Sequence, residues 1–295
     1  MADLTAIILT KDESRNLEKC LRSIEGFAQR VVVVDSGSMD DTAAIARSCG
    51  ADVYYHPFEN YARQFNWAID QTHITTQWTL RLDADERFTP ALCATMEQLL
   101  LVHNQDDVNG FLMESNFYFM NRLIRHGGPK KLKTMIFRTG FGRIEDRKMD
   151  EHTVVDGRVL EVKERFDHYD FKDLNAWIEK MNWYATREMQ DYFEFAACKD
   201  VGDAVSGQRV AARRKKKFGI YYRLPMFLRC WMLTVYFYIF RLGFLDGKEG
   251  FIYHWMYQRW YRTLVDAKIY EQLKNPRPFA ETGALGETRA SNEPL

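Results

Sequence analysis

Residues 31–42 read VVVVDSGSMDDT, in which an unbroken apolar run is followed at once by acidic and small polar residues. A continuous run of β-branched apolar residues is typical of a strand that is covered on both faces of a parallel sheet. Residues 4–10, LTAIILT, have the same character, and residues 16–24 between the two runs repeat apolar side chains at helical spacing. Together they predict a strand, a helix and a second strand, the repeating unit of a parallel sheet.

The same alternation continues along the chain. Helices are predicted at residues 42–49 and 61–71, and strands at residues 52–55 and 79–82. Residues 110–164 change to the alternation of hairpins punctuated by glycines, and residues 173–195 return to a helical pattern. The chain is therefore predicted to be an α/β protein, with a Rossmann-like mixed sheet flanked by helices.

The composition changes again after this helical stretch. Residues 213–217 are consecutive basic residues, and residues 218–240 are rich in apolar and aromatic side chains. We expect a first domain at residues 1–205, a C-terminal amphipathic helical appendage at residues 206–274, and a flexible tail at residues 275–295.

The overall composition sets limits on function. The 295 residues include 41 basic and 41 acidic ones, so no overall positive field attracts nucleic acid, and a hydrophobic content of 46% excludes general disorder. The five cysteines are scattered, without the close pairs of a zinc site or the dense pattern of a secreted disulfide-rich domain. The first residues show no pattern of a secretory signal. We therefore expect a cytoplasmic protein.

Residues 82–86, LDADE, close the last of these predicted strands. Residues two apart on a strand face the same way, so Asp83 and Asp85 are expected to converge at the carboxyl end of the sheet, where α/β proteins bind their ligands. Paired carboxylates suit Mg²⁺ or Mn²⁺ that bridges a diphosphate. The alternative is a solvated turn in which Glu86 and Arg87 are ordinary surface charges.

Two further strand ends are followed by carboxylates. Asp35 comes directly after the strand of residues 31–34, and a buried carboxylate there needs a partner, for which a nucleotide base or ribose is suitable. Glu13 follows the first strand and is expected beside Asp35 if the two strands are neighbours. Ser38 and Asp41 have the spacing of a capping box, which predicts helix initiation for this part of the segment.

These motifs together resemble a known family. TKDE at residues 10–13, the run at residues 31–42 and LDADE at residues 82–86 are similar, in order and spacing, to the motifs of family 2 glycosyltransferases with the GT-A fold. The resemblance covers residues 4 to about 195. Residues 244–271 are similar to the tail of bacterial enzymes of this family that glucosylate the lipopolysaccharide inner core.

The resemblance implies roles for individual residues. Glu13 and Asp35 are expected to hold the nucleotide, Asp83 to lie near the ribose and diphosphate, and Asp85 to bind the metal together with Asp83. His168 resembles a downstream histidine of related enzymes that reaches the metal or diphosphate, although a lone histidine often satisfies only a local hydrogen bond.

The family also places a general base after the DxD strand, in an acidic motif ahead of the acceptor-binding segment. We predict Asp150, and next Glu151, as this base; a charged loop without a catalytic role is the alternative. One position departs from the family. Relatives commonly read Gln-Lys-Asn or Gln-Arg-Asn where this chain reads Gln64-Phe65-Asn66. Gln64 is therefore expected to bind the nucleotide sugar, whereas the contact of a basic side chain with it is missing at Phe65.

The C-terminal region suggests a partner. The uncharged run at residues 230–240 is shorter than the roughly 18 to 20 residues that span a bilayer. The basic run at residues 213–217 stands beside a sequence rich in Trp and Tyr, which predicts a helix at residues 218–240 that lies in the interface of an anionic membrane. The aromatic stripe at residues 251–270 equally fits a core or a dimer face, which leaves the oligomeric state open. No RNA-binding motif accompanies the basic run, so nucleic acid is not an expected partner.

The resemblance implies metal-dependent, inverting transfer of a hexose, with glucose expected, from a UDP-sugar to a lipid-anchored glycan such as lipopolysaccharide core or a polyprenyl-linked oligosaccharide. We expect the enzyme to be peripheral on the cytoplasmic face of a bacterial inner membrane. The alternative is a non-catalytic, membrane-peripheral protein that binds nucleotide sugars, for which Phe65 is the hint. A nucleotidyltransferase is disfavoured, because residues 10–16 lack a glycine-rich phosphate loop.

Overall fold

A computed structural model describes residues 1–145, 152–169, 173–197 and 221–278. The chain divides into two compact units. The first contains Met1–Tyr118 and Pro129–Asp170, and the second contains Phe119–Gly128 and Phe171–Thr282. The predicted domain boundary at residues 205 and 206 and most of the predicted tail lie outside the described residues.

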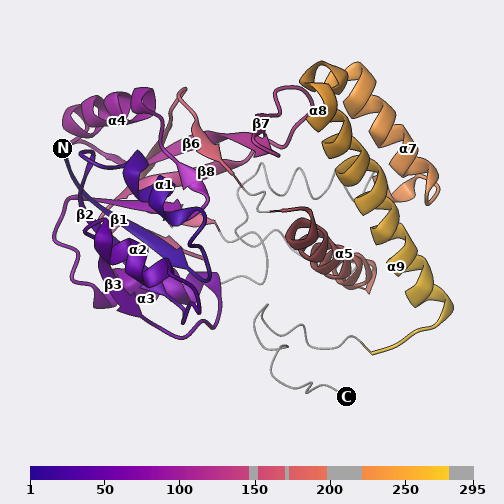
Figure 1. Cartoon of the computed structure of the whole chain (residues 1–295), viewed down its shortest axis with the longest axis horizontal. Helices are drawn as coiled ribbons and strands as arrows, with labels where there is room; N and C mark the ends of the chain where they lie inside the picture. Colours follow the sequence, from indigo (N-terminus) through magenta and orange to yellow (C-terminus); the bar gives the residue numbers. More distant parts are fainter. Residues whose placement is uncertain (146–151, 170–172, 198–220, 279–295) are drawn as a thin grey trace. The chain divides into compact units, whose positions relative to one another are not determined.

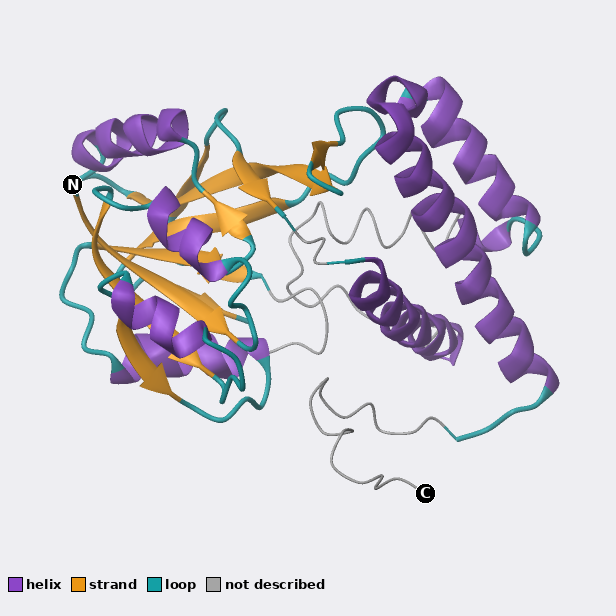
Figure 2. Cartoon of the chain, viewed as in Figure 1, coloured by secondary structure: helices purple, strands orange, loops and turns teal. Residues whose placement is uncertain are grey.

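The first half of the first unit is a parallel sheet with the strand order β3-β2-β1-β4, and its helices alternate with the strands (Figures 1 and 2). The predicted strands and helices of this half are all present. In chain order they are β1 (Ala2–Thr10), α1 (Leu17–Ser23), β2 (Ala28–Asp35), α2 (Thr42–Ser48), β3 (Asp52–Tyr55), α3 (Tyr61–Gln71) and β4 (Trp78–Asp83).

The sheet then becomes mixed. β8 pairs antiparallel with both β4 and β6, and β12 joins β6 to β5. The remaining elements are β5 (Glu86–Arg87), α4 (Pro90–Val102), β6 (Val108–Phe119), β7 (Arg122–Leu123), β8 (Leu132–Arg138), β9 (Gly142–Ile144), β10 (Thr153–Val155), β11 (Arg158–Glu161) and β12 (Phe166–His168). The predicted fold class, a Rossmann-like mixed α/β sheet with a C-terminal helical region, is confirmed.

The core lies on both faces of this sheet, which explains the continuous apolar runs. Ile8 of β1 packs in one cluster with residues of α1 and α4, whereas its neighbour Ile7 packs in a second cluster with residues of α3. Val33 and Val34 of β2 divide between the two clusters in the same way. A strand covered on both sides needs apolar residues at every position.

The second unit is helical. The predicted helix at residues 173–195 corresponds to α5, which packs against the last helix, α9. Its elements are α5 (Leu174–Ala197), η1 (Tyr221–Arg223), α7 (Leu228–Val235), η2 (Tyr236–Phe240), η3 (Gly243–Asp246), α8 (Gly247–His254), η4 (Trp255–Tyr261) and α9 (Arg262–Lys274), of which η2 and η4 are π-helical.

The predicted single helix at residues 218–240 is wrong for its described part. Residues 221–223 form a short 3₁₀ turn, and α7 begins only at Leu228. Pro225 cannot donate a helical hydrogen bond, and Phe227 has a φ of 64°. Within the described residues, no single helix is long and apolar enough to cross a membrane. In the same part of the chain one pair of helical segments, Leu228–Phe240 and Gly243–Lys274, is together long and apolar enough, but the pair is bent by 70° at its junction.

The aromatic side chains of residues 251–270 divide between core and surface: Tyr253 and Tyr261 are buried, whereas Phe251, Trp255 and Tyr270 are exposed. Ile252 and Met256 are partly exposed, whereas the polar side chains of Gln258 and Asp266 are buried. Met256 and Gln258 both lie in the π-helical segment η4. Because a π-turn holds more residues than an α-turn, the periodicity read from the sequence goes out of phase there.

Charged groups point into the second unit. The side chains of Arg229 and Asp266 are 1% and 0% exposed and form an ion pair, in which Arg229 Nε donates to Asp266 Oδ1 at 2.9 Å. Glu188 accepts hydrogen bonds from Tyr222 (2.9 Å), Tyr261 (2.7 Å) and Arg262 (2.7 Å). Burial raises the pKa of both tyrosines, so they remain donors at any ordinary pH.

Replacement of Arg229 by Met should destabilise the second unit by about 3–5 kcal/mol, because it leaves the carboxylate of Asp266 buried without its cation. The double variant Arg229→Met/Asp266→Leu removes both charges and should recover much of this loss. Urea unfolding followed by tryptophan fluorescence measures both. A single variant as stable as the wild type would mean that the pair is not buried as described.

Candidate active site

The ends of three parallel strands meet at one edge of the sheet. Thr10, the last residue of β1, is in register with Asp35 of β2, and Leu9 is in register with Asp83 of β4. The strands that precede Glu13 and Asp35 are therefore neighbours, as their predicted proximity requires. The acidic residues predicted from three separate motifs belong to one edge.

The loops that follow β1 and β2 are fastened to each other. Lys11 Nζ donates to Gly37 O (2.5 Å), Asp12 N–H to Ser38 Oγ (2.9 Å) and Met39 N–H to Asp12 Oδ1 (2.8 Å). Further along, Glu13 N–H donates to Thr42 Oγ1 at 2.8 Å. These bonds hold the backbone at the strand ends in one arrangement before any ligand arrives.

Asp35 is 6% exposed and finds its partners inside the protein. Its carboxylate accepts from the N–H groups of Gly37 (3.0 Å) and Ser38 (2.9 Å), from the Ser38 hydroxyl, and from Thr10 Oγ1 (3.1 Å). Four donors fill the acceptor positions of a carboxylate. Asp35 thus shapes the loop, and the need for a ligand partner that was inferred from the sequence does not arise.

The predicted capping box is wrong. The N-cap residue of α2 is Asp41, without a side-chain cap, while Ser38 bonds to Asp12 and Asp35. Asp40 takes over the helix start, because its carboxylate accepts from Thr42 N–H (3.1 Å) and Ser14 N–H (3.1 Å). Burial opposes ionisation of Asp40, but the hydrogen bonds from Ser14 and Thr42 outweigh it and lower its pKa.

Gln64 and Phe65 both lie in the interior. Gln64 is 0% exposed; its Nε2 donates to His56 O (2.9 Å) and Ser36 Oγ (3.1 Å), and its Oε1 lies 2.6 Å from His56 Nδ1. The predicted contact of Gln64 with the nucleotide sugar does not fit this position, because the side chain is enclosed and all its polar atoms are hydrogen-bonded inside the protein. Phe65 is also 0% exposed and packs with Ile7. Packing therefore explains Phe65, the hint for a non-catalytic binding protein.

Asp83 is held by a cation and a phenol. Lys133 Nζ lies 2.7 Å from both Asp83 Oδ2 and Glu86 Oε2, and the Tyr61 hydroxyl donates to Asp83 Oδ1 at 2.6 Å. Arg81 donates to that same hydroxyl at 2.9 Å. Burial acts to raise the pKa of Asp83, but Lys133 and Arg81 outweigh it and lower the pKa to about 2. Asp83 is thus an ionised carboxylate with one lone pair left on each oxygen.

Asp85 lies beside His168. β12 pairs with β5, which sets His168 opposite Glu86, and His168 Nε2 is 3.4 Å from Asp85 Oδ2. The other ring nitrogen, Nδ1, is buried and has no hydrogen-bond partner among the described residues. Two ligands of one Mg²⁺ or Mn²⁺ ion lie about 3 Å apart, so this pair fits as part of a metal site.

Asp85 and His168 do not complete a metal site on their own. No cluster of three or more His, Cys, Asp or Glu side chains in the described part of the chain has the arrangement of a metal site. Asp83, predicted as a second carboxylate ligand, is bonded to Lys133 and Tyr61 and keeps one lone pair on each oxygen. A site with one carboxylate and one imidazole suits an ion whose remaining positions are filled by substrate phosphates and water.

Several contributors were missed in the sequence. Glu86 is 3% exposed and not a surface charge; burial, then the charge of Asp83, raises its pKa. Relatives commonly have Lys or Arg at the position of Phe65, and in this chain Arg81 and Lys133 supply positive charge beside Asp83. Arg81 interrupts an apolar strand, TLRLD, which is a signal that could have identified it, but nothing local distinguishes Lys133 from the neighbouring lysines.

The predicted bases, Asp150 and Glu151, lie outside the described residues. The described chain resumes at His152, and the next residue, Thr153, is tied to the site. Thr153 Oγ1 accepts from Arg81 Nη1 at 3.2 Å and donates to Thr134 O at 3.0 Å.

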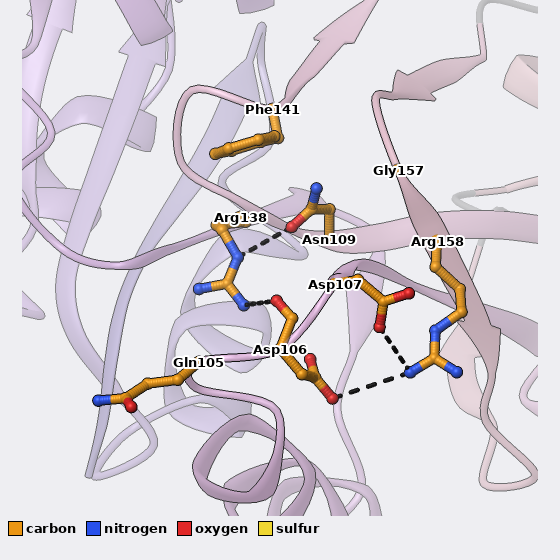
Figure 3. Close-up of a pocket in the computed structure, with 8 residues that line it drawn as sticks. All are labelled: Gln105, Asp106, Asp107, Asn109, Arg138, Phe141, Gly157 and Arg158. Atoms are coloured by element: carbon orange, nitrogen blue, oxygen red, sulfur yellow. Dashed lines mark hydrogen bonds and ion pairs between the residues drawn. The ribbon is translucent and has the colours of Figure 1, made fainter.

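A hollow of about 500 Å³ lies elsewhere on the first unit (Figure 3). Both of its arginines already have partners, since Arg138 donates to the neutral amide of Asn109 at 2.9 Å and Arg158 forms an ion pair with Asp107 at 3.0 Å. Arg138 is in register with Trp78, at the start of β4, whereas Asp83 ends that strand. The hollow is therefore at the opposite edge from the acidic strand ends and is not the candidate site.

Comparisons with known proteins identify the family. Residues 5–151 match the family model described as Glycosyl transferase family 2. An uncharacterized glycosyltransferase of Rickettsia felis is 25% identical over 99% of both chains. The lipopolysaccharide core biosynthesis glycosyltransferase LpsC of Rhizobium meliloti is 26% identical over 91% of this chain and 92% of its own length.

Among solved structures, glucosyl-3-phosphoglycerate synthase from Mycobacterium tuberculosis, in complex with Mn²⁺, UDP and glucosyl-3-phosphoglycerate, matches with a TM-score of 0.31 and 20% identity, over 39% of this chain and 44% of that one. This likeness is too low to bear on the ligands of the present chain. The family match, by contrast, includes all three strand-end motifs, and the relatives named above extend over nearly the whole chain. The chain is a glycosyltransferase of family 2, with the family domain in residues 5–151.

Proposed function

We propose that the enzyme transfers a hexose, with inversion, from a UDP-sugar to a hydroxyl of a lipid-anchored glycan of the lipopolysaccharide core type, at the cytoplasmic face of a membrane. The observation on which this rests is the pairing of Asp85 with His168, 3.4 Å apart, beside the cation-compensated Asp83. The similarity to LpsC along 91% of the chain supports the class of acceptor.

The donor half of the mechanism follows from the strand ends. Asp83, fixed by Lys133 and Tyr61, keeps lone pairs with which to accept from the ribose hydroxyls. Glu13 and the loop shaped by Asp35 flank the nucleotide. Asp85 and His168 would hold Mn²⁺ or Mg²⁺, which supplies neutralisation of the charge that develops on the departing diphosphate.

The acceptor half needs a base. Asp150, or Glu151 next to it, would take the proton of the acceptor hydroxyl as that oxygen attacks the anomeric carbon, and a single displacement gives inversion. The chain of hydrogen bonds from Thr153 through Arg81 and Tyr61 to Asp83 supports this assignment, because it ties the chain just after this segment to the donor side.

Asp85→Asn should abolish turnover and the Mn²⁺-dependent part of UDP binding, because it removes the charged ligand while the fold stays intact. Asp3→Asn makes the same chemical change at the exposed start of β1 and is the matched control. Calorimetric titration of UDP with and without Mn²⁺, together with UDP release from UDP-glucose, gives the measurement. Unchanged Mn²⁺-dependent affinity in Asp85→Asn would remove the metal assignment.

Asp83→Asn should behave differently, because Asp83 is bonded to Lys133 and Tyr61. We expect UDP affinity to fall roughly tenfold, the scale of one hydrogen bond to a charged group, while the response to Mn²⁺ persists. The same titrations measure it. Loss of the Mn²⁺ response in this variant would show that Asp83 is a metal ligand after all.

Asp150→Asn should lower kcat by about 10² or more, the usual contribution of a general base, with UDP affinity unchanged. Glu151→Gln is the matched variant one residue away. Steady-state kinetics with an acceptor glycan decide between them. If only Glu151→Gln shows the loss, the base is Glu151; if neither does, this acidic segment is not the base.

A further inference from the structure

The outward face of α7 and η2 is apolar along its whole length. Its exposed side chains recur at spacings of three and one residues, which is one face of a helix. They are Leu228, Trp231, Met232, Val235, Tyr236, Ile239 and Phe240, with exposed fractions from 39% to 72%. A helix on the surface of a soluble protein normally turns such a stripe toward the core.

The charged side chains of the same region point the other way. Arg229 is the only charged residue in Leu228–Phe240, and it is 1% exposed and paired with Asp266 on α9. Beyond Phe240, Asp246 is 3% exposed and accepts from His126 N–H and Nδ1, both at 2.8 Å. The distribution of apolar and charged groups is therefore inverted relative to a helix that faces water.

The apolar surface continues past the end of η2. Leu242, Phe244 and Leu245 in the following turn are 45–53% exposed, and Phe251 and Trp255 on α8 are 50% and 46% exposed. The ring of Tyr238 lies 6.3 Å from that of Phe244 and 5.8 Å from that of Phe251, so these elements form one surface (η2, η3 and α8). We call Leu228–Trp255 with these exposed side chains the apolar face.

The exposed charges next to the apolar face are positive. Arg223 precedes α7, Arg241 follows η2 and Lys248 starts α8, and all three are exposed. Arg125 is exposed on the loop that packs on η3, where Gly127 approaches His254 and Arg241. The two acids of Leu228–Trp255 are Asp246, which is buried, and Glu249, which is only partly exposed. Apolar and aromatic side chains with a basic rim match the interface of a bilayer that contains anionic lipid.

We propose that the apolar face inserts shallowly into one leaflet of an anionic membrane, with Arg125, Arg223, Arg241 and Lys248 at the level of the lipid phosphates. An exposed apolar surface of this extent marks an interaction site. The inference deepens the proposed function, whose lipid-anchored acceptor lies in such a membrane, but it rests on the second unit alone. It replaces the helix expected at residues 218–240 by a face built from α7, η2, η3 and α8.

The test compares two charge-matched double variants of the full chain. Ile239→Glu/Phe240→Glu places two carboxylates in the apolar face, at side chains that are 52% and 72% exposed. Leu101→Glu/Val102→Glu makes the same change on α4 of the first unit, at side chains that are 74% and 73% exposed. Flotation with vesicles of phosphatidylethanolamine and phosphatidylglycerol measures binding. We expect the first variant to lower the partition coefficient about tenfold or more and the control to leave it unchanged.

A second arm tests the basic rim. Arg241→Gln/Lys248→Gln should weaken binding to these vesicles, and binding of the wild type should fall with added salt and with vesicles of phosphatidylcholine alone. Circular dichroism establishes that each variant is folded. The inference is overturned if the intact chain does not float or if both glutamate variants bind equally. It is also overturned if carbonate washing fails to release the protein, which is the behaviour of a hairpin that spans the membrane.

Two readouts separate this inference from the proposed function. Sedimentation tests whether the apolar face instead joins two copies of the chain: a dimer that Ile239→Glu/Phe240→Glu makes monomeric would also overturn the inference. UDP release from UDP-glucose in solution should be unchanged in that variant, because it lies in the second unit. If the wild type floats but never releases UDP from any UDP-sugar, the proposed function fails and the membrane face stands.

Discussion

Carboxylates at the ends of buried strands have to be compensated, because a low-dielectric interior penalises an unpaired charge by several kcal/mol. The strand-end edge meets this constraint in two ways. Asp35 is satisfied by hydrogen bonds from its own loop, and Asp83 by Lys133 and Tyr61. The first arrangement fixes the backbone of the loop that follows β2, and the second keeps a carboxylate ionised. The geometry of the site follows from these two solutions.

The second unit meets the same constraint with a different result. Asp266 and Glu188 are satisfied from within by Arg229, Arg262 and two tyrosines. Drawing the charges inward leaves the outside of α7 and η2 to apolar side chains. In the first unit, the compensated carboxylates form a polar edge of the sheet. In the second unit, the charged groups are paired in the interior, and the outside of α7 and η2 carries apolar side chains. One physical requirement thus accounts for both the bonded carboxylates at the strand ends and the apolar face.

Most of the first sheet can be predicted from the sequence, because a strand covered on both faces is a continuous apolar run and can be recognised without knowledge of its tertiary contacts. The sequence also brings Asp35, Glu13 and Asp83 to one edge, since strand order follows from the repeated unit. What it misses depends on contacts between distant segments. Lys133 reaches Asp83 from 50 residues away, and Gln64 is enclosed by His56 and Ser36. The π-turn η4 shifts the phase of the last helix, which no α-helical periodicity can anticipate.

The chain enters the second unit twice, first for Phe119–Gly128 and then from Phe171 onward. The ring of Phe119, at the end of β6, packs 5.9 Å from Trp177 and 5.5 Å from Tyr253. The last residue of β6 therefore belongs to the core of the helical unit. Phe119 and Trp177 precede residue 205 and Tyr253 follows it, so a chain joined near residue 205 from two relatives would take the two sides of this core from different parents, and the segment Phe119–Gly128 has to be exchanged together with the C-terminal helices if the packing is to be kept.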